Sequence, residues 1–193
     1  IATDIAASKG ILPVSGAGNN GNDPWYFIGT PADADSALAV GAVDSLRNYA
    51  GFSSKGPSYD GRVKPNVAAQ GQFTVVSSPV GGIIRVNGTS LSSPIIAGMA
   101  SCLWQHYPDA TNMQILNAIQ ESASQYLNPD TLIGFGIPDF CKADSLLSVI
   151  ANVNSSFAED GFTFYPNPSS GIFFIAFQNT KYKIQSLEIY NVL

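Results

Sequence analysis

The feature that most constrains the fold is residues 87–100, where a glycine turn leads into a long apolar helix. Polar residues typical of helix starts come first, and Pro94 falls in the first turn, where a missing N–H costs nothing. Residues 95–104 are apolar on nearly every side, so we expect a buried central helix. Small side chains would let neighbouring backbone approach this helix closely; they are Ala97, Gly98, Ala100 and Ser101.

Ser90 lies at the start of this helix and is a candidate nucleophile. A hydroxyl there faces free N–H groups and the positive end of the helix dipole, which can hold a developing oxyanion. The alternative is that Thr89 or Ser90 is simply the N-cap of the helix, by far the commoner role for such residues. The helix start alone leaves both interpretations open.

Composition limits the size of the core and the kinds of partner. The chain has 193 residues, of which 45% are hydrophobic, enough for one main core and a small appendage. The formal charge of −5 disfavours nucleic acid and anionic membranes as partners. No apolar run reaches the roughly 18 residues that span a bilayer. The chain starts at Ile1 rather than at an initiator methionine, so we expect a fragment or a processed product.

Two cysteines are too few for a disulfide framework. Cys102 falls inside the apolar helix, so we expect a small buried thiol there. Pairing of Cys102 with Cys141 is left open.

The first part of the chain alternates helix and strand signals. Residues 1–9 resemble the end of a helix, with Gly10 as its left-handed C-terminal residue. Strands are expected at residues 11–14, 37–43 and 73–77, the last returning through a hairpin at Gly81 and Gly82. The continuous apolar run 37–43 indicates a parallel sheet covered on both faces, hence an α/β fold.

The second part of the chain changes character. Helices are expected at residues 112–123 and 141–150, followed by an irregular linker at 151–161. Residues 162–193 alternate apolar and polar side chains, which is typical of β structure. We therefore predict a main domain at residues 1–150 and a small β domain at 162–193.

Three loop motifs together resemble the subtilisin-like serine proteases. They are the small-residue run 16–21, the stretch 52–57 with its continuation 60–67, and the nucleophile motif 88–94, Gly-Thr-Ser-Leu-Ser-Ser-Pro. The resemblance covers residues 1–147. It implies the C-terminal portion of a three-layer, subtilisin-like parallel sheet whose N-terminal part is missing.

The resemblance also implies roles for single residues. Ser90 would be the nucleophile, and Asn19 would donate to the oxyanion. Gly16, Ala17 and Gly18 would line one wall of the primary substrate pocket, leaving room for a large apolar side chain. The implied activity is that of a secreted serine endopeptidase acting on protein or peptide substrates.

The chain departs from the family pattern at three places. The family usually has histidine at the position of Ile95 and aspartate at that of Asn66, and residues 68–71 replace an alanine-proline-glycine motif. None of these departures removes a named catalytic role.

A general base for Ser90 is not evident. The one histidine, His106, falls in the same expected helix, about 24 Å from Ser90 at 1.5 Å per residue. A base must come within about 3 Å, so His106 is excluded and is expected at the surface. A Ser-Lys pair using Lys55 or Lys64 is a minor alternative. The family order places aspartate and histidine before serine, so both are expected upstream of Ile1 and this chain alone is expected to be inactive.

The tail resembles the C-terminal sorting domains of the type IX secretion system. The matching features are the turn motif 164–171, the alternating strand 172–177 and residues 187–191. The family's closing strands are absent, so the domain is expected to be truncated. The resemblance implies secretion or a cell-surface location, with the secretion machinery as partner; a generic Greek-key module is the alternative.

Two alternative functions share some of these features. A non-catalytic, protease-like surface module that binds peptides or polysaccharide would share every motif named above. An α/β-hydrolase esterase is disfavoured because Ser92 stands where the Gly-x-Ser-x-Gly elbow needs its second glycine. No cofactor or metal site is predicted, since no Asp/Asn spacing typical of calcium loops occurs; calcium in a longer parent protein is left open.

Overall fold

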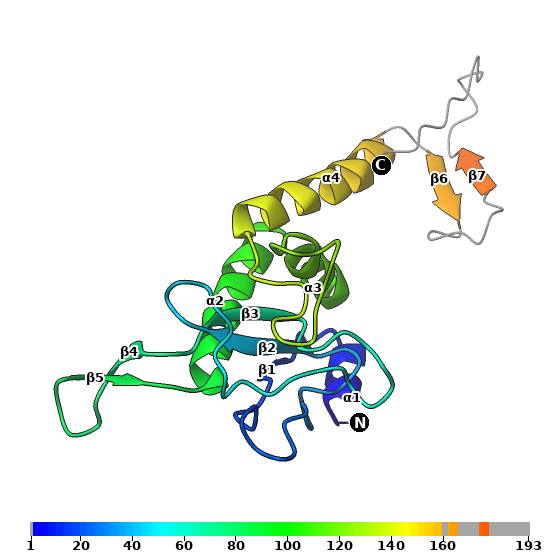
Figure 1. Ribbon diagram of the computed structural model, residues 1–193. Coiled ribbons are helices and arrows are strands. Elements are labelled where there is room, and N and C mark those ends of the chain that lie inside the picture. Colours follow the sequence, from blue (N-terminus) through cyan, green and yellow to red (C-terminus); the bar gives the residue numbers. More distant parts are fainter. Residues whose placement is uncertain (1, 160–161, 166–173, 178–193) are drawn as a thin grey trace. The chain divides into compact units, whose positions relative to one another are not determined.

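The computed structural model describes residues 2–159, 162–165 and 174–177 (Figure 1). The chain divides into two compact units, Ile1–Ser148 and Val149–Leu193. The first unit contains a parallel sheet with helices, as the sequence predicted.

The sheet has three strands in the order β1-β2-β3, all parallel. They are β1 (Val14–Gly16), β2 (Leu38–Val43) and β3 (Val67–Gln70). The first begins later than predicted and includes Ser15 and Gly16, whose backbones pair with β2. Strand β3 was not predicted, because it has only four residues and no alternation of apolar and polar side chains. Central strand β2 is buried along its whole length.

Both faces of the sheet are covered, as the apolar run of β2 predicted. On one face Leu38 and Val40 pack in a core cluster with Ile96 of helix α2 (Thr89–His106). On the other face Ala39 joins a second cluster with Ile28, from the segment between β1 and β2. Figure 1 shows α2 running across the sheet, and α2 contacts all three strands.

The predicted central helix is confirmed, but its burial is not. Only one stripe of α2 is buried, at the spacing of a single helix face: Thr89, Ser92, Ile96, Ala100 and Leu103. Ile95 and Met99 are 43% and 42% exposed, and Cys102 is exposed rather than buried. The prediction failed because the described sheet covers only one side of the helix, and the apolar side chains on its other sides remain exposed.

Two of the other helices follow local signals. Helix α1 (Ala2–Ser8) is followed by Gly10 at φ +86°, and α3 (Asn112–Glu121) begins with a reciprocal Thr111–Gln114 capping box. Helix α4 (Phe140–Glu159) is longer than predicted. Residues 151–159 are therefore helical, and the irregular linker expected there is wrong.

A two-stranded hairpin precedes α2. Strands β4 (Thr74–Ser77) and β5 (Ile83–Val86) pair antiparallel, and the turn contains Gly81 and Gly82 at positive φ, as predicted. The hairpin projects from the sheet (Figure 1).

In the second unit, strands β6 (Phe162–Tyr165) and β7 (Phe174–Phe177) pair antiparallel. Residues 187–191, which the resemblance to sorting domains includes, lie outside the described residues.

Candidate active site

Ser90 lies in the first turn of α2, and the N-cap residue of this helix has no side chain that could cap it. Gly88 is the N-cap residue and no side-chain capping bond is present, so the alternative that Thr89 or Ser90 is the cap is wrong. The backbone N–H of Thr89 donates to Asn19 and that of Leu91 to the Gly88 carbonyl. Within the described part of the chain, the Ser90 N–H has no such acceptor. It therefore presents a free donor beside the Ser90 hydroxyl, which is exposed.

The side chain of Asn19 is held in one orientation at this helix start. Its Oδ1 accepts from the backbone N and the Oγ1 of Thr89, at 2.9 and 3.1 Å. These bonds fix the oxygen toward Thr89, and no acceptor for the amide Nδ2 occurs among the residues that the structure describes, so Nδ2 can donate to a ligand. A Cβ built on Gly88 would lie 2.9 Å from Ser90 Oγ and 3.6 Å from Asn19 Nδ2. Ser90 Oγ and Asn19 Nδ2 therefore both lie close to Gly88, and hence close to each other, although the two residues are far apart in the sequence.

Thr89 joins the loop after β1 to the helix. Besides donating to Asn19, its Oγ1 accepts from the backbone N of Gly18 at 3.2 Å. A Cβ on Gly16 would lie only 2.8 Å from that oxygen, so this close approach requires glycine. This positioning role of Thr89 was not predicted, because nothing in the local sequence distinguishes it from an ordinary threonine at a helix start.

Ser54 holds the other side of the same loop. Its Oγ accepts from the backbone N of Asn20 at 3.1 Å, and its own N donates to the Gly18 carbonyl at 2.9 Å. Gly18 has φ +109°, and a Cβ there would meet Ser54 Oγ at 2.7 Å. The motif 52–57 therefore serves to shape the loop that carries Asn19.

A cleft of about 560 Å³ opens beside this loop, and we call it the Asp23 cleft. It is lined by the small residues Gly16, Ala17 and Gly18, as the resemblance implied for a substrate pocket, together with Ser54. The remaining lining residues come from one segment, of which only Asn20 falls in a predicted motif, the run 16–21: Asn20, Asp23, Pro24, Trp25, Phe27, Gly29 and Thr30.

No candidate base among the described residues contacts Ser90. His106 ends α2, the helix that Ser90 begins, and its Nδ1 lies 2.8 Å from Asp144 Oδ1. The Lys55 Nζ lies over the Tyr26 ring, 5.1 Å from its centroid. The Lys64 Nζ donates to the Ala37 carbonyl and to Asn66 Oδ1. The geometry gives no support to a Ser-Lys pair.

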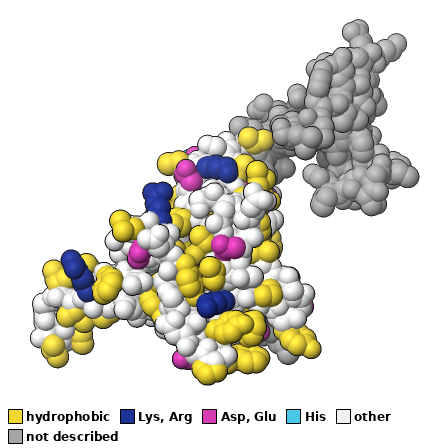
Figure 2. Space-filling view, viewed as in Figure 1, with side chains coloured by type: hydrophobic (Ala, Val, Ile, Leu, Met, Phe, Trp, Pro, Cys, Tyr) yellow, Lys and Arg dark blue, Asp and Glu magenta, His cyan; other side chains and the backbone are white. Residues whose placement is uncertain are grey.

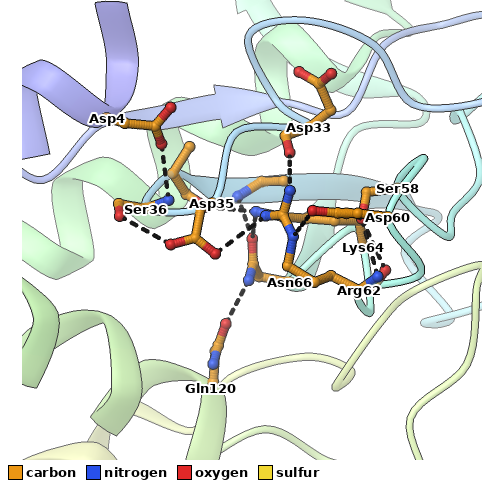
Figure 3. Close-up of polar contacts among 12 residues, drawn as sticks. Asp4, Asp33, Asp35, Ser36, Ser58, Asp60, Arg62, Lys64, Asn66 and Gln120 are labelled. Atoms are coloured by element: carbon orange, nitrogen blue, oxygen red, sulfur yellow. Dashed lines mark hydrogen bonds and ion pairs between the residues drawn. The ribbon is translucent and has the colours of Figure 1, made fainter. Parts of the chain in front are cut away.

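Lys64 belongs to a buried polar network instead (Figure 3). It is 1% exposed, and its two acceptors lie at 2.8 and 2.9 Å. Asn66 Oδ1 also accepts from Ala39 N, and its Nδ2 donates to Gln120 Oε1. Burial, with a smaller contribution from the charge of Arg62, lowers the pKa of Lys64 to about 8. The family's usual aspartate is therefore replaced by a neutral amide beside a buried lysine.

Metal ligands, membrane-spanning helices and basic patches are three further kinds of feature that would bear on function. No group of three or more His, Cys, Asp or Glu side chains suited to a metal ion occurs in the described part of the chain. None of its helices has the length and hydropathy needed to cross a membrane. Basic side chains are scattered singly over the face drawn in Figure 2, with no basic patch.

Comparisons with known proteins place this geometry in a family. The Subtilase family (Peptidase_S8) matches residues 1–136. Subtilisin DY of Bacillus licheniformis is 38% identical over 124 residues, which cover 64% of this chain and 43% of that protein. Subtilisin E of Bacillus subtilis (strain 168) is 36% identical over 135 residues, 69% of this chain and 34% of that protein. The chain thus spans less than half of these relatives.

Solved structures show the same fold. The prenylagaramide maturation protease PagA superposes with a TM-score of 0.64 at 25% identity, covering 75% of this chain and 53% of that one. The S41 psychrophilic protease superposes with a TM-score of 0.62 at 31% identity, covering 72% and 51%. The motifs, the parallel sheet and these similarities agree, and the chain belongs to the subtilase family.

Proposed function

We propose that this chain is the nucleophile-bearing part of a serine endopeptidase, with Ser90 as the nucleophile and Asn19 as an oxyanion donor. The single observation that carries the proposal is the fixed orientation of Asn19, whose Oδ1 is held by Thr89 while Nδ2 stays available near Ser90 Oγ. A loop asparagine with only a conformational role would not need two hydrogen bonds to the start of α2.

The chemistry follows from these positions. Ser90 Oγ attacks the carbonyl carbon of the scissile peptide bond, and the proton of the hydroxyl passes to a general base. The Ser90 N–H and the Asn19 amide then donate to the carbonyl oxygen as it becomes negative. Because both donors are in place beforehand, they stabilise the transition state with little rearrangement.

The base is the missing component. His106, the chain's one histidine, is at the far end of α2, and the lysines discussed above are engaged elsewhere. We propose that an aspartate and a histidine outside residues 1–193 complete the triad, as the family resemblance implies. The isolated chain should then be inactive.

Labelling with a fluorophosphonate tests this proposal. The 193-residue chain should react no faster than its Ser90→Ala variant, whereas a longer product of the same gene should be labelled stoichiometrically at Ser90. In that longer protein, Asn19→Leu should lower kcat by about 10²–10³-fold, the magnitude known for the equivalent donor of a subtilisin. A longer protein that is folded but never labelled would favour a non-catalytic peptide-binding module.

We also propose that the parent is exported and that residues 162–193 belong to a type IX sorting domain, with the secretion machinery as partner. The support is the turn motif 164–171 and the antiparallel pair β6–β7. Fusing residues 149–193 to a periplasmic reporter in a cell with that system tests it. Surface display that depends on the system supports the proposal, and equal retention with and without the tail contradicts it.

A further inference from the structure

The Asp23 cleft contains one charged side chain and exposed aromatic surface. Asp23 is the sole ionisable residue among those that line it, and Trp25 and Phe27 line it as well. Trp25 is 71% exposed, and its ring contacts Phe27 edge-on, with centroids 5.4 Å apart. A carboxylate beside aromatic rings is the combination that attracts an organic cation, because aromatic faces carry negative potential.

The Asp23 carboxylate is held in place but has capacity left. Its Oδ2 accepts from Asn20 Nδ2 at 2.8 Å, and its backbone N donates to the Asn20 carbonyl at 2.8 Å. Among the described residues, Oδ1 has no partner. This oxygen can therefore accept from a guanidinium or ammonium group without breaking an existing bond.

The cleft is next to the candidate nucleophile. Gly16 and Gly18 line it, and both lie against Thr89, the residue before Ser90. A peptide whose carbonyl reaches Ser90 would therefore place a neighbouring side chain in the cleft. Its volume of about 560 Å³ accommodates a long side chain.

We infer that the Asp23 cleft selects an arginine or lysine side chain of a peptide substrate, with Asp23 as the acceptor and Trp25 as an aromatic wall. This inference rests on the proposed function, because it names the side chain that a peptide at Ser90 presents. The side chain inferred here is cationic, whereas Gly16, Ala17 and Gly18 alone led us to expect a large apolar one. Those three residues determine the space available, and Asp23 determines the charge that the cleft favours. The formal charge of −5 adds a long-range attraction for cationic peptides.

Peptide binding to the 193-residue chain tests the inference without requiring catalysis. The probes are acetyl-Ala-Ala-Ala-Arg-amide and its citrulline and norleucine counterparts; citrulline keeps the shape of arginine but is neutral. Binding is followed by tryptophan fluorescence, and Trp25→Phe identifies the signal of Trp25 against that of Trp104. Because the site is open to solvent, the arginine peptide should bind about fivefold more tightly than the citrulline peptide.

Asp23→Asn is the matched variant, since it removes the charge but keeps an oxygen for Asn20. It should bring the two affinities within error of each other, and 1 M salt should reduce the preference of the native chain. Equal affinities in the native chain, tighter binding of norleucine, a preference that survives Asp23→Asn, or no binding of any peptide would each overturn the inference. Fluorophosphonate labelling of the longer protein tests the catalytic role of Ser90, whereas peptide binding tests the selectivity of the Asp23 cleft. The two proposals can therefore be refuted independently.

Discussion

The buried Lys64 should make the stability of this chain depend on alkaline pH. Its Nζ has two neutral acceptors, and its pKa is about 8 in the folded chain against 10.5 as the ordinary value. Between these two values the unfolded chain binds more protons than the folded one, so the free energy of unfolding should rise with pH. The two pKa values differ by an amount equivalent to about 3 kcal/mol. The charged lysine thus destabilises the fold below pH 8, and the penalty disappears as pH approaches 10.5.

The assay is urea denaturation of the native chain and of Lys64→Met at intervals from pH 7 to 10.5. Other groups titrate in this range, but they are common to both proteins. The difference in unfolding free energy, native minus Lys64→Met, should therefore increase by about 3 kcal/mol with pH, whatever its starting value. A difference that stays flat, or falls, would refute the argument that burial dominates the environment of Lys64.

Asn66→Asp provides a second, independent check. It places a carboxylate where Asn66 Oδ1 now lies, 2.9 Å from the Lys64 Nζ, and Gln120 can turn its amide to donate to it. The carboxylate should raise the pKa of Lys64, so the increase in stability between pH 8 and 10.5 should shrink or move to higher pH. An unchanged pH profile would mean that Lys64 does not titrate in the folded chain.

Three further variants test the site and its surroundings. Gly16→Ala should destabilise the chain by about 1–3 kcal/mol, because the added Cβ would meet Thr89 Oγ1 at 2.8 Å. Gly98→Ala is the control, since it adds a Cβ in open space on α2 and should stabilise the chain by about 0.5–1 kcal/mol. Thermal and urea denaturation measure both changes in stability, and equal effects of the two variants would contradict the close approach at Gly16. Thr89→Val should lower the free energy of unfolding by about 1–3 kcal/mol, because the hydroxyl of Thr89 bonds both Gly18 and Asn19. It should also shift the side-chain amide NMR signals of Asn19. Unchanged signals would mean that the Thr89 hydroxyl does not orient that amide. His106→Gln should change the free energy of unfolding by less than about 1 kcal/mol, since the contact of His106 with Asp144 is exposed. Labelling of Ser90 in the longer protein should be unaffected, because His106 ends the helix that Ser90 begins. Loss of labelling would contradict the exclusion of His106 as the base.

Local signals were sufficient for much of the fold. The capping box at Thr111, the left-handed Gly10 and the hairpin turn at Gly81 depend on backbone conformation within a few residues. The apolar run of β2 is long enough to indicate a strand covered on both faces. The helix start at Ser90 was predicted for the same reason, because cap-type residues, proline and an apolar run follow one another directly.

Tertiary structure decided the rest. The short strand β3 exists because Val67 to Gln70 pair with β2, and the end of α4 could not be inferred from the polar residues after 150. One face of α2 is buried because a sheet lies against it, which the all-round apolar sequence of that helix does not specify. The environment of Lys64 likewise arises from Ala37 and Asn66 closing around it.

The candidate site shows the division most clearly. The sequence alone predicts a helix start at Ser90 and a loop at the end of a strand for Asn19, because glycines precede both residues. It does not predict their meeting, because the bonds from Thr89 to Asn19 join residues 70 positions apart. Hydrogen bonds of this kind depend on the parallel strands, which hold the loop after β1 beside the start of α2. The sequence by itself therefore determined which groups are available, and packing of the sheet against the helix decided that they act at one place.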